Sequence, residues 1–161
     1  MGAARAKGQP DALRIRRVRA EDIPLVAALD KRVTGVAKAP YWRDIFARYG
    51  KRRLRERFFL VAEPAAREAE RALFGFIVGE VRAWEFGSAP CGWIFALSVE
   101  QGARLRGVGE ALFAAISGEF ARSGVTKIRT MVARSDRLPM LFFRGAGMAA
   151  GPYIQLEMDI E

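Results

Sequence analysis

Histidine is absent from this chain of 161 residues, and cysteine occurs once, at Cys91. Without histidine, Ser-His-Asp and Cys-His catalysis, the paired-histidine zinc motif and most transition-metal sites are excluded. A single cysteine forms neither an intrachain disulfide nor a cysteine-rich metal cluster. The sequence therefore predicts no metal and a chain suited to a reducing cytoplasm.

Long apolar runs are absent too. No stretch is long enough to span a membrane, and no signal-peptide core stands at the start, so we expect a cytoplasmic location without a membrane partner. Hydrophobic residues make up 51% of the chain, which is enough for the core of one domain. We expect residues 1–11 to be a disordered leader and residues 12–161 to form that domain.

Acidic residues are outnumbered, because 27 Lys and Arg face 18 Asp and Glu, which gives a formal net charge of +9. Such a charge raises the affinity for anions, nucleic acid included. The basic residues are spread along the chain, however, with clusters at residues 14–19 and 51–57 and few aromatics among them. A solvated basic face is the favoured interpretation. A nucleic-acid-binding domain is an alternative that rests on net charge alone.

Hydrophobic periodicity predicts an α/β fold without internal repeats. Alternating or apolar runs predict strands over residues 13–19, 58–63, 73–81, 92–99, 125–133 and 153–160. Helical spacing of apolar residues predicts helices over residues 20–35, 41–49, 110–122 and 138–145. Pro24 near the start of the first helix and Gly35 at its end agree with this assignment.

A basic turn with two glycines separates the strand at residues 92–99 from the helix that follows. It reads Arg104-Leu105-Arg106-Gly107-Val108-Gly109. Glycine lets the backbone approach a ligand closely, and the first turn of a helix presents unpaired N–H groups at the positive end of the helix dipole. A phosphate group is the ligand that this arrangement favours.

Two well-known phosphate loops do not fit this turn. A Walker A loop needs Lys and then Ser or Thr after its second glycine, whereas Val108 and Gly109 follow Gly107. A dinucleotide-binding loop needs a third glycine where Leu112 stands. The turn instead resembles the acetyl-CoA pyrophosphate loop of the GNAT N-acetyltransferases, whose pattern is Gln or Arg, two residues, Gly, one residue, and then Gly or Ala.

A second stretch carries the same resemblance. Residues 136–148 resemble the family's second signature, in which Asn is followed at fixed spacings by Ala, Phe-Tyr and Gly-Phe. Departures from it include Asp136 in place of the Asn, Phe143 in place of the Tyr and Met148 in place of the final Phe. Leu97 and Val99 also occupy the alternating apolar positions of the family's fourth strand. The matches cover the C-terminal half of the chain.

The resemblance implies a mixed, mostly antiparallel, twisted sheet flanked by helices, with a V-shaped splay between the two central strands. Acetyl-CoA would be the cosubstrate, its pantetheine arm pairing in the splay with the backbone of residues 97–99. The Arg104 side chain and the amides of residues 106–110 would hold the pyrophosphate. The residues expected at the cofactor are Leu97, Ser98, Val99, Arg104, Leu105, Arg106, Gly107, Val108, Gly109, Glu110, Asp136 and Phe143.

The family's activity is direct transfer of an acetyl group from acetyl-CoA to an amine. The Tyr that often protonates the leaving thiolate is Phe143 here. The proton would come from water or from Tyr153, or the thiolate would leave unassisted, since a thiol pKa of about 8.5 makes it a fair leaving group. An acetyl-CoA-binding sensor or regulatory domain with little or no turnover is the alternative function.

Glu80 is the candidate general base, because the fourth strand contains no carboxylate and Glu80 ends the apolar strand expected beside it. The competing interpretation is that Glu80 is the solvated end of its strand. Glu100 is interpreted as a surface residue of the phosphate loop. Cys91 is interpreted as a small core or turn residue, because the family forms no acyl-enzyme.

In this family the region between the first two helices, here residues 34–49, walls the acceptor site. Asp30, Tyr41, Trp42 and Asp44 are candidates for orienting the amine, although residues at these positions also suit a core or a surface. The acceptor stays open among a protein N-terminus, a lysine, a polyamine, an amino acid and an antibiotic. Many members pair through C-terminal strands, so the alternating residues 153–158 predict a homodimer.

Overall fold

The computed structural model of the protein describes residues 13–66 and 71–160. These residues belong to two compact units, one ending at Thr130 and the other beginning at Met131. The predicted leader, residues 1–11, lies outside the described residues. A single domain over residues 12–161 stays a prediction.

The first unit contains a five-stranded sheet with the strand order β1-β2-β3-β4-β5. Strands β1 to β4 pair antiparallel in chain order, and β5 pairs parallel to β4. The sheet is therefore mixed and mostly antiparallel, as the sequence predicted. Its strands are β1 (Leu13–Arg17), β2 (Arg57–Pro64), β3 (Gly75–Arg82), β4 (Cys91–Val99) and β5 (Ile128–Thr130).

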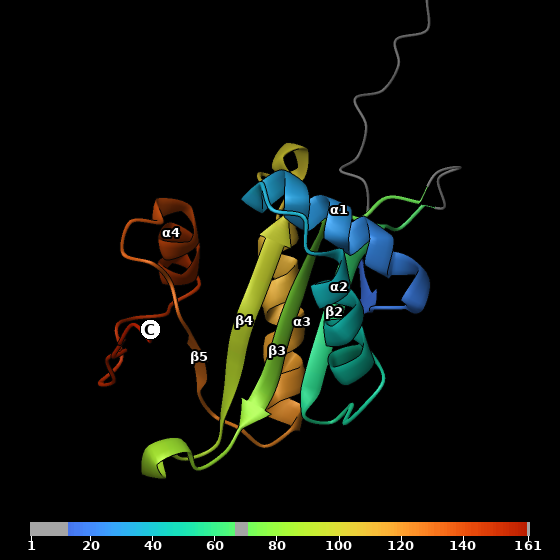
Figure 1. Ribbon diagram of the computed structural model, residues 1–161. Coiled ribbons are helices and arrows are strands. Elements are labelled where there is room, and N and C mark those ends of the chain that lie inside the picture. The colour runs from blue at the N-terminus through green and yellow to red at the C-terminus, as the bar shows by residue number, and fades with distance from the viewer. Residues whose placement is uncertain (1–12, 67–70, 161) are drawn as a thin grey trace, which may run out of the picture. The chain divides into compact units, whose positions relative to one another are not determined.

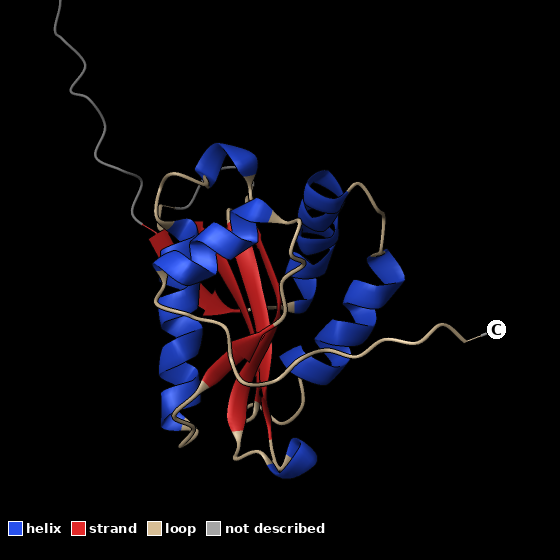
Figure 2. Cartoon of the chain, turned by 90° about the vertical axis from the view of Figure 1, so that its left-hand side faces the viewer, coloured by secondary structure: helices blue, strands red, loops and turns tan. Residues whose placement is uncertain are grey.

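Helices cover both faces of this sheet, with α3 on one side and α1 and α2 on the other (Figure 1, Figure 2). The helices are α1 (Ile23–Thr34), α2 (Ala39–Ile45) and α3 (Val108–Arg122), which confirms three of the predicted helices within a few residues. A π-helical turn, η2 (Phe46–Gly50), extends α2. Short 3-10 turns are η1 (Ala20–Asp22), η3 (Glu85–Gly87) and η4 (Gln101–Ala103). No helix in the described ranges is long and apolar enough to cross a membrane.

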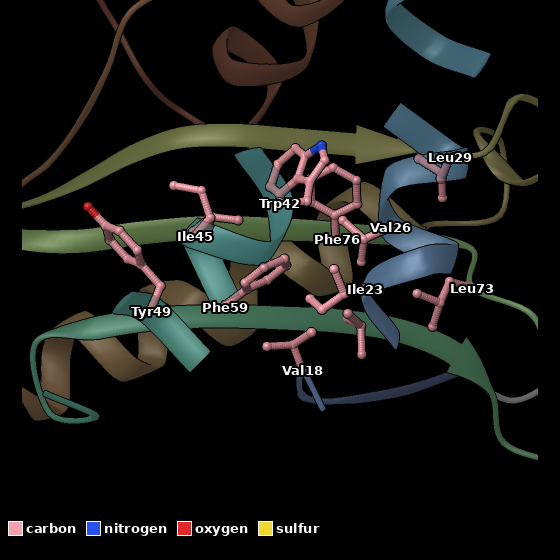
Figure 3. Close-up of a cluster of buried hydrophobic side chains, with 12 residues drawn as sticks. Val18, Ile23, Val26, Leu29, Trp42, Ile45, Tyr49, Phe59, Leu73 and Phe76 are labelled. Carbon is pink, nitrogen blue, oxygen red and sulfur yellow. The ribbon is translucent and has the colours of Figure 1, made fainter. Parts of the chain in front are cut away.

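The core beneath α1 and α2 is a cluster of buried aliphatic and aromatic side chains (Figure 3). Trp42 of α2 packs edge to face on Phe76 of β3, with ring centroids 4.8 Å apart, and its ring lies 5.9 Å from that of Phe59. Such aromatic contacts bury the most apolar area per residue and fix α2 on the sheet. The cluster comprises Val18, Ile23, Val26, Leu29, Trp42, Ile45, Tyr49, Phe59, Val61, Leu73, Phe76 and Val78.

Glycine lets α3 approach the opposite face closely. A Cβ at Gly92 of β4 would lie 2.4 Å from the buried Phe120 ring, and a Cβ at Gly79 of β3 would lie 2.9 Å from the same ring. Any other residue at either position would push the helix off the strands. Since α3 begins at the phosphate loop, these glycines also set where that loop lies against β4.

A bulge in β4 accompanies the splay. Val78 of β3 pairs with Ala96, but the next residue, Gly79, pairs with Ile94, so Phe95 is an extra residue in β4. A bulge bends its strand and increases the local twist. Ile94 is also the last β4 residue that pairs with β5. Among the described residues no strand pairs with residues 95–99 on that side, and this is the V-shaped opening that the resemblance implied.

The second unit contains α4 (Arg137–Gly145), which confirms the predicted helix at residues 138–145. The predicted strand over residues 153–160 is wrong, because these residues are exposed and form no strand. Alternation gives a segment one apolar face, but a strand also needs a neighbour for its backbone groups. The described part of this unit offers no such neighbour. Strand β5 is likewise shorter than the predicted residues 125–133, because its pairing with β4 ends at Thr130.

Candidate active site

The predicted phosphate loop connects β4 to α3. Gly107 is the N-cap of α3 and has a φ of 74°, in the left-handed region that favours glycine. The first helical hydrogen bond runs from the Ala111 N–H to the Gly107 carbonyl oxygen, at 3.0 Å. The amides of residues 108–110 therefore precede the helical ladder and have no acceptor within the helix. The helix start has the geometry of an anion site.

Two other amides of the loop already donate within it. The Arg104 N–H donates to the Gln101 carbonyl oxygen at 3.4 Å, and the Arg106 N–H donates to the Ala103 carbonyl oxygen at 3.1 Å. The Arg106 amide was predicted to hold phosphate, but its N–H already donates to the Ala103 carbonyl oxygen. The amides of residues 107–110 are therefore the stronger candidates. The guanidinium of Arg106 lies over the Phe74 ring, 5.0 Å from its centroid.

Glu100 braces the start of this loop. Its carboxylate accepts a hydrogen bond from the Gln101 N–H at 3.2 Å and ion-pairs with Arg32 of α1 at 2.5 Å. The hydrogen bonds from Arg32 and the charge of that guanidinium hold the pKa of Glu100 below its usual value. A carboxylate held in its charged form by these partners is a weak base, in agreement with the interpretation of Glu100 as a loop residue.

Hydrogen-bond alternation decides which β4 backbone groups face the opening. The Glu100 N–H donates to the Phe74 carbonyl oxygen at 2.7 Å. Hydrogen-bonded and non-hydrogen-bonded pairs alternate along an antiparallel ladder. Ser98, two residues before Glu100, therefore directs its backbone groups toward β3, whereas Leu97 and Val99 direct theirs away from it. Of the three residues predicted to pair with the pantetheine arm, Leu97 and Val99 have the required backbone orientation.

Glu80 lies on β3, opposite Trp93 of β4 and Arg57 of β2. Its side chain is 18% exposed. The Tyr49 hydroxyl donates to Glu80 Oε2 at 2.9 Å, and Arg82 Nε donates to Oε1 at 3.1 Å. Arg57 Nε lies 3.9 Å from Oε2. Glu80 is thus the centre of a half-buried polar cluster, and the interpretation as a bare strand end does not describe it.

Tyr49 joins this cluster to the bulge in β4. Its ring packs edge to face on Phe95, with centroids 5.1 Å apart, and the residue is buried. Burial and the hydrogen bond to Glu80 raise the pKa of Tyr49 to about 12. The hydroxyl therefore stays protonated near neutral pH and remains a donor. Sequence reasoning assigned Tyr49 only to a helix face, because no local signal links it to a carboxylate 31 residues away.

The four residues considered for orienting the acceptor divide between core and surface. Asp30 is buried, accepts a hydrogen bond from Trp42 Nε1 at 2.9 Å and ion-pairs with Lys38 at 3.0 Å. These contacts tie α1 to α2, so Asp30 and Trp42 serve the packing of the two helices. Tyr41 is partly exposed, and Asp44 is exposed and ion-pairs with Arg48.

The remaining predicted cofactor residues belong to the second unit. Asp136 is the N-cap of α4, and its carbonyl oxygen accepts a hydrogen bond from the Met140 N–H at 3.3 Å. Phe143 is buried and packs edge to face on Phe142, with centroids 5.2 Å apart. Tyr153, considered as a proton donor, is 57% exposed. The residues predicted at the cofactor are therefore divided between the two units.

A cavity of about 640 Å³ lies elsewhere in the first unit, beside β1 and the start of α1. Its polar lining is already paired, because Arg16 lies 2.6 Å from both Asp22 and Glu63, and Arg71 lies 2.7 Å from Asp22. None of the predicted site residues lines it. Within the described ranges, no group of three His, Cys, Asp or Glu is placed to hold a metal ion.

A sheet that opens beside a left-handed glycine and a helix start defines a GNAT-type α/β domain. The model of the acetyltransferase (GNAT) family matches residues 23–144, more than half of the chain. The chain therefore belongs to the GNAT acetyltransferase family. No curated protein matches it.

Solved structures share the fold at low sequence identity. The aminoglycoside N-acetyltransferase AAC(6')-Iy in complex with CoA is 13% identical, covers 96% of this chain and 99% of its own, and has a TM-score of 0.79. An aminoglycoside acetyltransferase from an uncultured soil metagenomic sample, in complex with sisomicin, is 16% identical to this chain and has a TM-score of 0.69. The match covers 92% of this chain and 97% of the other. A transcriptional regulator from Bacillus halodurans C-125 is 18% identical to this chain and has a TM-score of 0.71. The match covers 92% of this chain and 100% of the other.

Proposed function

We propose that this chain is an N-acetyltransferase that moves the acetyl group of acetyl-CoA directly to a primary amine. One observation carries the proposal. After Ile94 no strand in the described ranges pairs with β4 on the β5 side as far as Val99, and the chain then reaches the left-handed Gly107 and the first turn of α3. A strand edge followed by a helix start suits an amide-containing arm followed by a pyrophosphate.

The chain's own groups would hold the cosubstrate as follows. The amides of residues 107–110 and the Arg104 side chain bind the pyrophosphate, and the backbone groups of Leu97 and Val99 pair with the pantetheine arm as an added strand would. Asp136 and Phe143, in the second unit, stay predictions from the family resemblance. The CoA complex of AAC(6')-Iy, a structure with the same fold, supports this choice of ligand.

Proton transfer is assigned to the cluster around Glu80. Acetyl-CoA supplies the acetyl thioester when bound. Glu80 takes the proton of the amine, directly or through a water, and the Tyr49 hydroxyl fixes the orientation of the carboxylate. Glu80 lies opposite Trp93 and Val99 lies opposite Gly75, so the backbone N–H that donates to the thioester carbonyl oxygen belongs to the stretch of β4 on the Glu80 side of Val99. Phe143 has no proton to give, so water or Tyr153 protonates the thiolate, or the thiolate leaves unassisted.

The acceptor that we propose is a small molecule with a primary amine. Two structures with this fold were solved with aminoglycoside-type ligands, one with sisomicin and one with a bisubstrate analog of CoA and an acetylneamine. At identities of 16% and 14% they supply a first class of compounds to test.

The single cysteine, Cys91, is buried and free, which suits a cytoplasmic enzyme.

A sensor that binds acetyl-CoA without turnover is the second candidate. One observation favours it: Phe143 stands where the family often has the Tyr that protonates the leaving thiolate, and β4 contains no carboxylate. The transcriptional regulator from Bacillus halodurans C-125 shows that the fold also occurs in a protein named for regulation.

Two measurements on the full chain separate these functions. Free-thiol release from acetyl-CoA is followed over a panel of aminoglycosides, polyamines, amino acids and lysine peptides, while calorimetry measures CoA binding. We expect CoA binding together with thiol release for at least one amine. CoA binding with thiol release for none of the amines would favour the sensor, and absence of CoA binding would contradict both functions.

A further inference from the structure

Two large aromatic side chains stand exposed at the tip of the β3–β4 hairpin. Residues 83–87, here called the aromatic hairpin, are all exposed, and Trp84 and Phe86 have exposed fractions of 70% and 104%. Isolated exposed apolar residues are common, but two adjacent aromatic side chains on a projecting turn form a small apolar surface that water solvates poorly.

The backbone of the aromatic hairpin keeps these side chains outward. Trp84 and Phe86 have φ values of 60° and 46°, in the left-handed region that residues other than glycine rarely adopt. The base of the turn is closed by the Ser88 N–H, which donates to the Glu85 carbonyl oxygen at 2.9 Å. Arg129 Nη1 of β5 donates to Ser88 Oγ at 3.1 Å. Unfavourable backbone held by its surroundings is typical of functional turns.

A strongly basic segment lies at the same end of the sheet. Residues 51–56, here called the basic loop, are all exposed and carry four basic side chains, Lys51, Arg52, Arg53 and Arg55, against the single acid Glu56. The Val81 N–H donates to the Glu56 carbonyl oxygen at 2.7 Å, which joins the loop to the end of β3, where the hairpin begins. Figure 1 shows the loop and the hairpin at the lower end of the sheet.

Further basic residues surround this end. Lys127 precedes β5 and is exposed, and its carbonyl oxygen accepts a hydrogen bond from the Gly92 N–H at the start of β4. Arg122 ends α3, and the neighbouring Ser123 hydroxyl donates to the Arg55 carbonyl oxygen at 2.7 Å. Positive charge from three separate segments of the first unit therefore lies at this end of the sheet.

We propose that the aromatic hairpin and the basic loop dock the protein on an anionic lipid bilayer. Trp and Phe enter the interfacial region of the bilayer, and the basic residues set back from the tip pair with anionic headgroups. This docking needs no membrane-spanning helix. The prediction of no membrane partner rested on the absence of long apolar runs. A hairpin that binds the membrane surface does not require such runs.

The distribution of charge favours a bilayer over nucleic acid. Bases that stack on aromatic side chains carry their phosphates beside the rings, so cations are expected next to the aromatics. The aromatic hairpin contains no Lys or Arg, and its one charged residue, Glu85, is acidic. A tip that lacks basic residues, with cations set behind it, matches the depth order of acyl chains and headgroups instead, and the charge of Glu85 is paired with Arg82 at 3.9 Å.

Cosedimentation with vesicles tests this docking surface. The full chain is mixed with vesicles of phosphatidylcholine alone or of equal parts phosphatidylcholine and phosphatidylglycerol. We expect binding to the anionic vesicles only, lowered about thirtyfold in Arg52→Gln/Arg53→Gln, since each basic residue near an anionic surface contributes about fivefold. Trp84→Ser/Phe86→Ser should also lose most binding. The matched controls are Arg14→Gln and Val36→Ser, which remove an exposed charge and an exposed apolar side chain elsewhere in the first unit.

Tryptophan fluorescence provides a second readout on the unmodified protein. Trp84 is exposed, so its emission should shift to the blue when anionic vesicles are added, and Trp84→Phe should bind vesicles without that shift. No binding to anionic vesicles would overturn the proposal. An equal loss of binding in the control variants would also overturn it. So would a protein that binds a single-stranded oligonucleotide through the aromatic hairpin but does not bind the vesicles.

Discussion

Two acids of the first unit, Asp22 and Glu80, both lie between arginines, yet their surroundings differ. Asp22 is completely buried and ion-pairs with Arg16 at 2.6 Å and Arg71 at 2.7 Å, and it accepts the Arg19 N–H at 2.7 Å. Glu80 is 18% exposed, with Arg82 at 3.1 Å and Arg57 at 3.9 Å. The first carboxylate is shielded from solvent, and the second is in contact with solvent.

The difference shows how one set of residue types serves two purposes. Burial alone raises the pKa of Asp22, but hydrogen bonds from Arg16 and from the Arg19 amide, with the charges of Arg16 and Arg71, hold it below its usual value. That network joins β1 to the start of α1 and is a matter of stability. Around Glu80, the contacts are longer, the side chain is partly exposed, and each carboxylate oxygen has a second lone pair that can accept a proton, which is what a general base requires.

Breaking the buried ion-pair network around Asp22 should have the largest effect on the free energy of unfolding. Asp22→Asn removes one of the two carboxylates that pair with the buried Arg16 guanidinium, which keeps Glu63, and it should lower the free energy of unfolding by about 2–3 kcal/mol. Asp44→Asn is the matched control, because the Asp44–Arg48 pair is exposed and should contribute less than about 1 kcal/mol. Urea unfolding of both variants measures the difference. Equal losses would mean that the network contributes no more than a surface pair.

Removing the Glu80 carboxylate should impair turnover strongly and lower stability only modestly. Glu80→Gln keeps the size of the side chain but not the base, so turnover should fall about a hundredfold, the usual scale for general-base removal. The acidic limb of the pH–rate profile should disappear, while CoA affinity stays the same. Glu56→Gln, which alters an exposed acid at the same end of the sheet, is the control. Parental turnover with an intact acidic limb would assign the base to solvent.

Acid should progressively weaken the ion pairs whose carboxylates have a lowered pKa. The pKa of Asp22, Glu63 and Glu100 lies below the ordinary values of 3.8 for Asp and 4.5 for Glu. Groups with a lowered folded pKa contribute their stability above the unfolded pKa and lose it as the pH falls through the folded value. The free energy of unfolding should hold steady down to about pH 5 and drop below it. Asp22→Asn should show a shallower drop, and an identical slope would remove Asp22 from this account.

The smallest effect is expected at Tyr49. Tyr49→Phe removes one hydrogen bond to Glu80 and should cost about 1 kcal/mol of stability. If Tyr49 positions the base, turnover should fall several-fold and the acidic limb of the pH–rate profile should move. A change in stability with an unmoved pH profile would limit Tyr49 to packing against Phe95.

The sequence predicted what local pattern controls. The alternation in β1 to β4, the amphipathic spacing in α1 and α3, and the glycine turn at Gly107 each act over a few residues, and the structure confirms them. The splay followed from the family resemblance, and its physical cause, the extra residue Phe95, has no signature in the sequence.

What the sequence did not predict depends on contacts between distant residues. Tyr49 meets Glu80 across 31 positions, and Arg71 meets Asp22 across 49. Both are single polar contacts that hydrophobic periodicity does not encode. The predicted strand at residues 153–160 failed for the converse reason, because its alternation is local but its pairing partner is not. The homodimer predicted through residues 153–158 stays a prediction, and light scattering at micromolar concentration tests it.

CoA affinity of the parent and of two glycine variants tests the central claim most directly. Gly107 and Gly124 lie just before and just after α3, both have left-handed φ values, and a Cβ at either meets nothing within 4 Å. Valine at either position therefore introduces similar backbone strain, but only at Gly107 does it stand where a phosphate would approach. We predict by calorimetry that Gly107→Val loses CoA binding while Gly124→Val keeps it. Equal CoA affinity in the two variants would contradict the assignment of the phosphate loop.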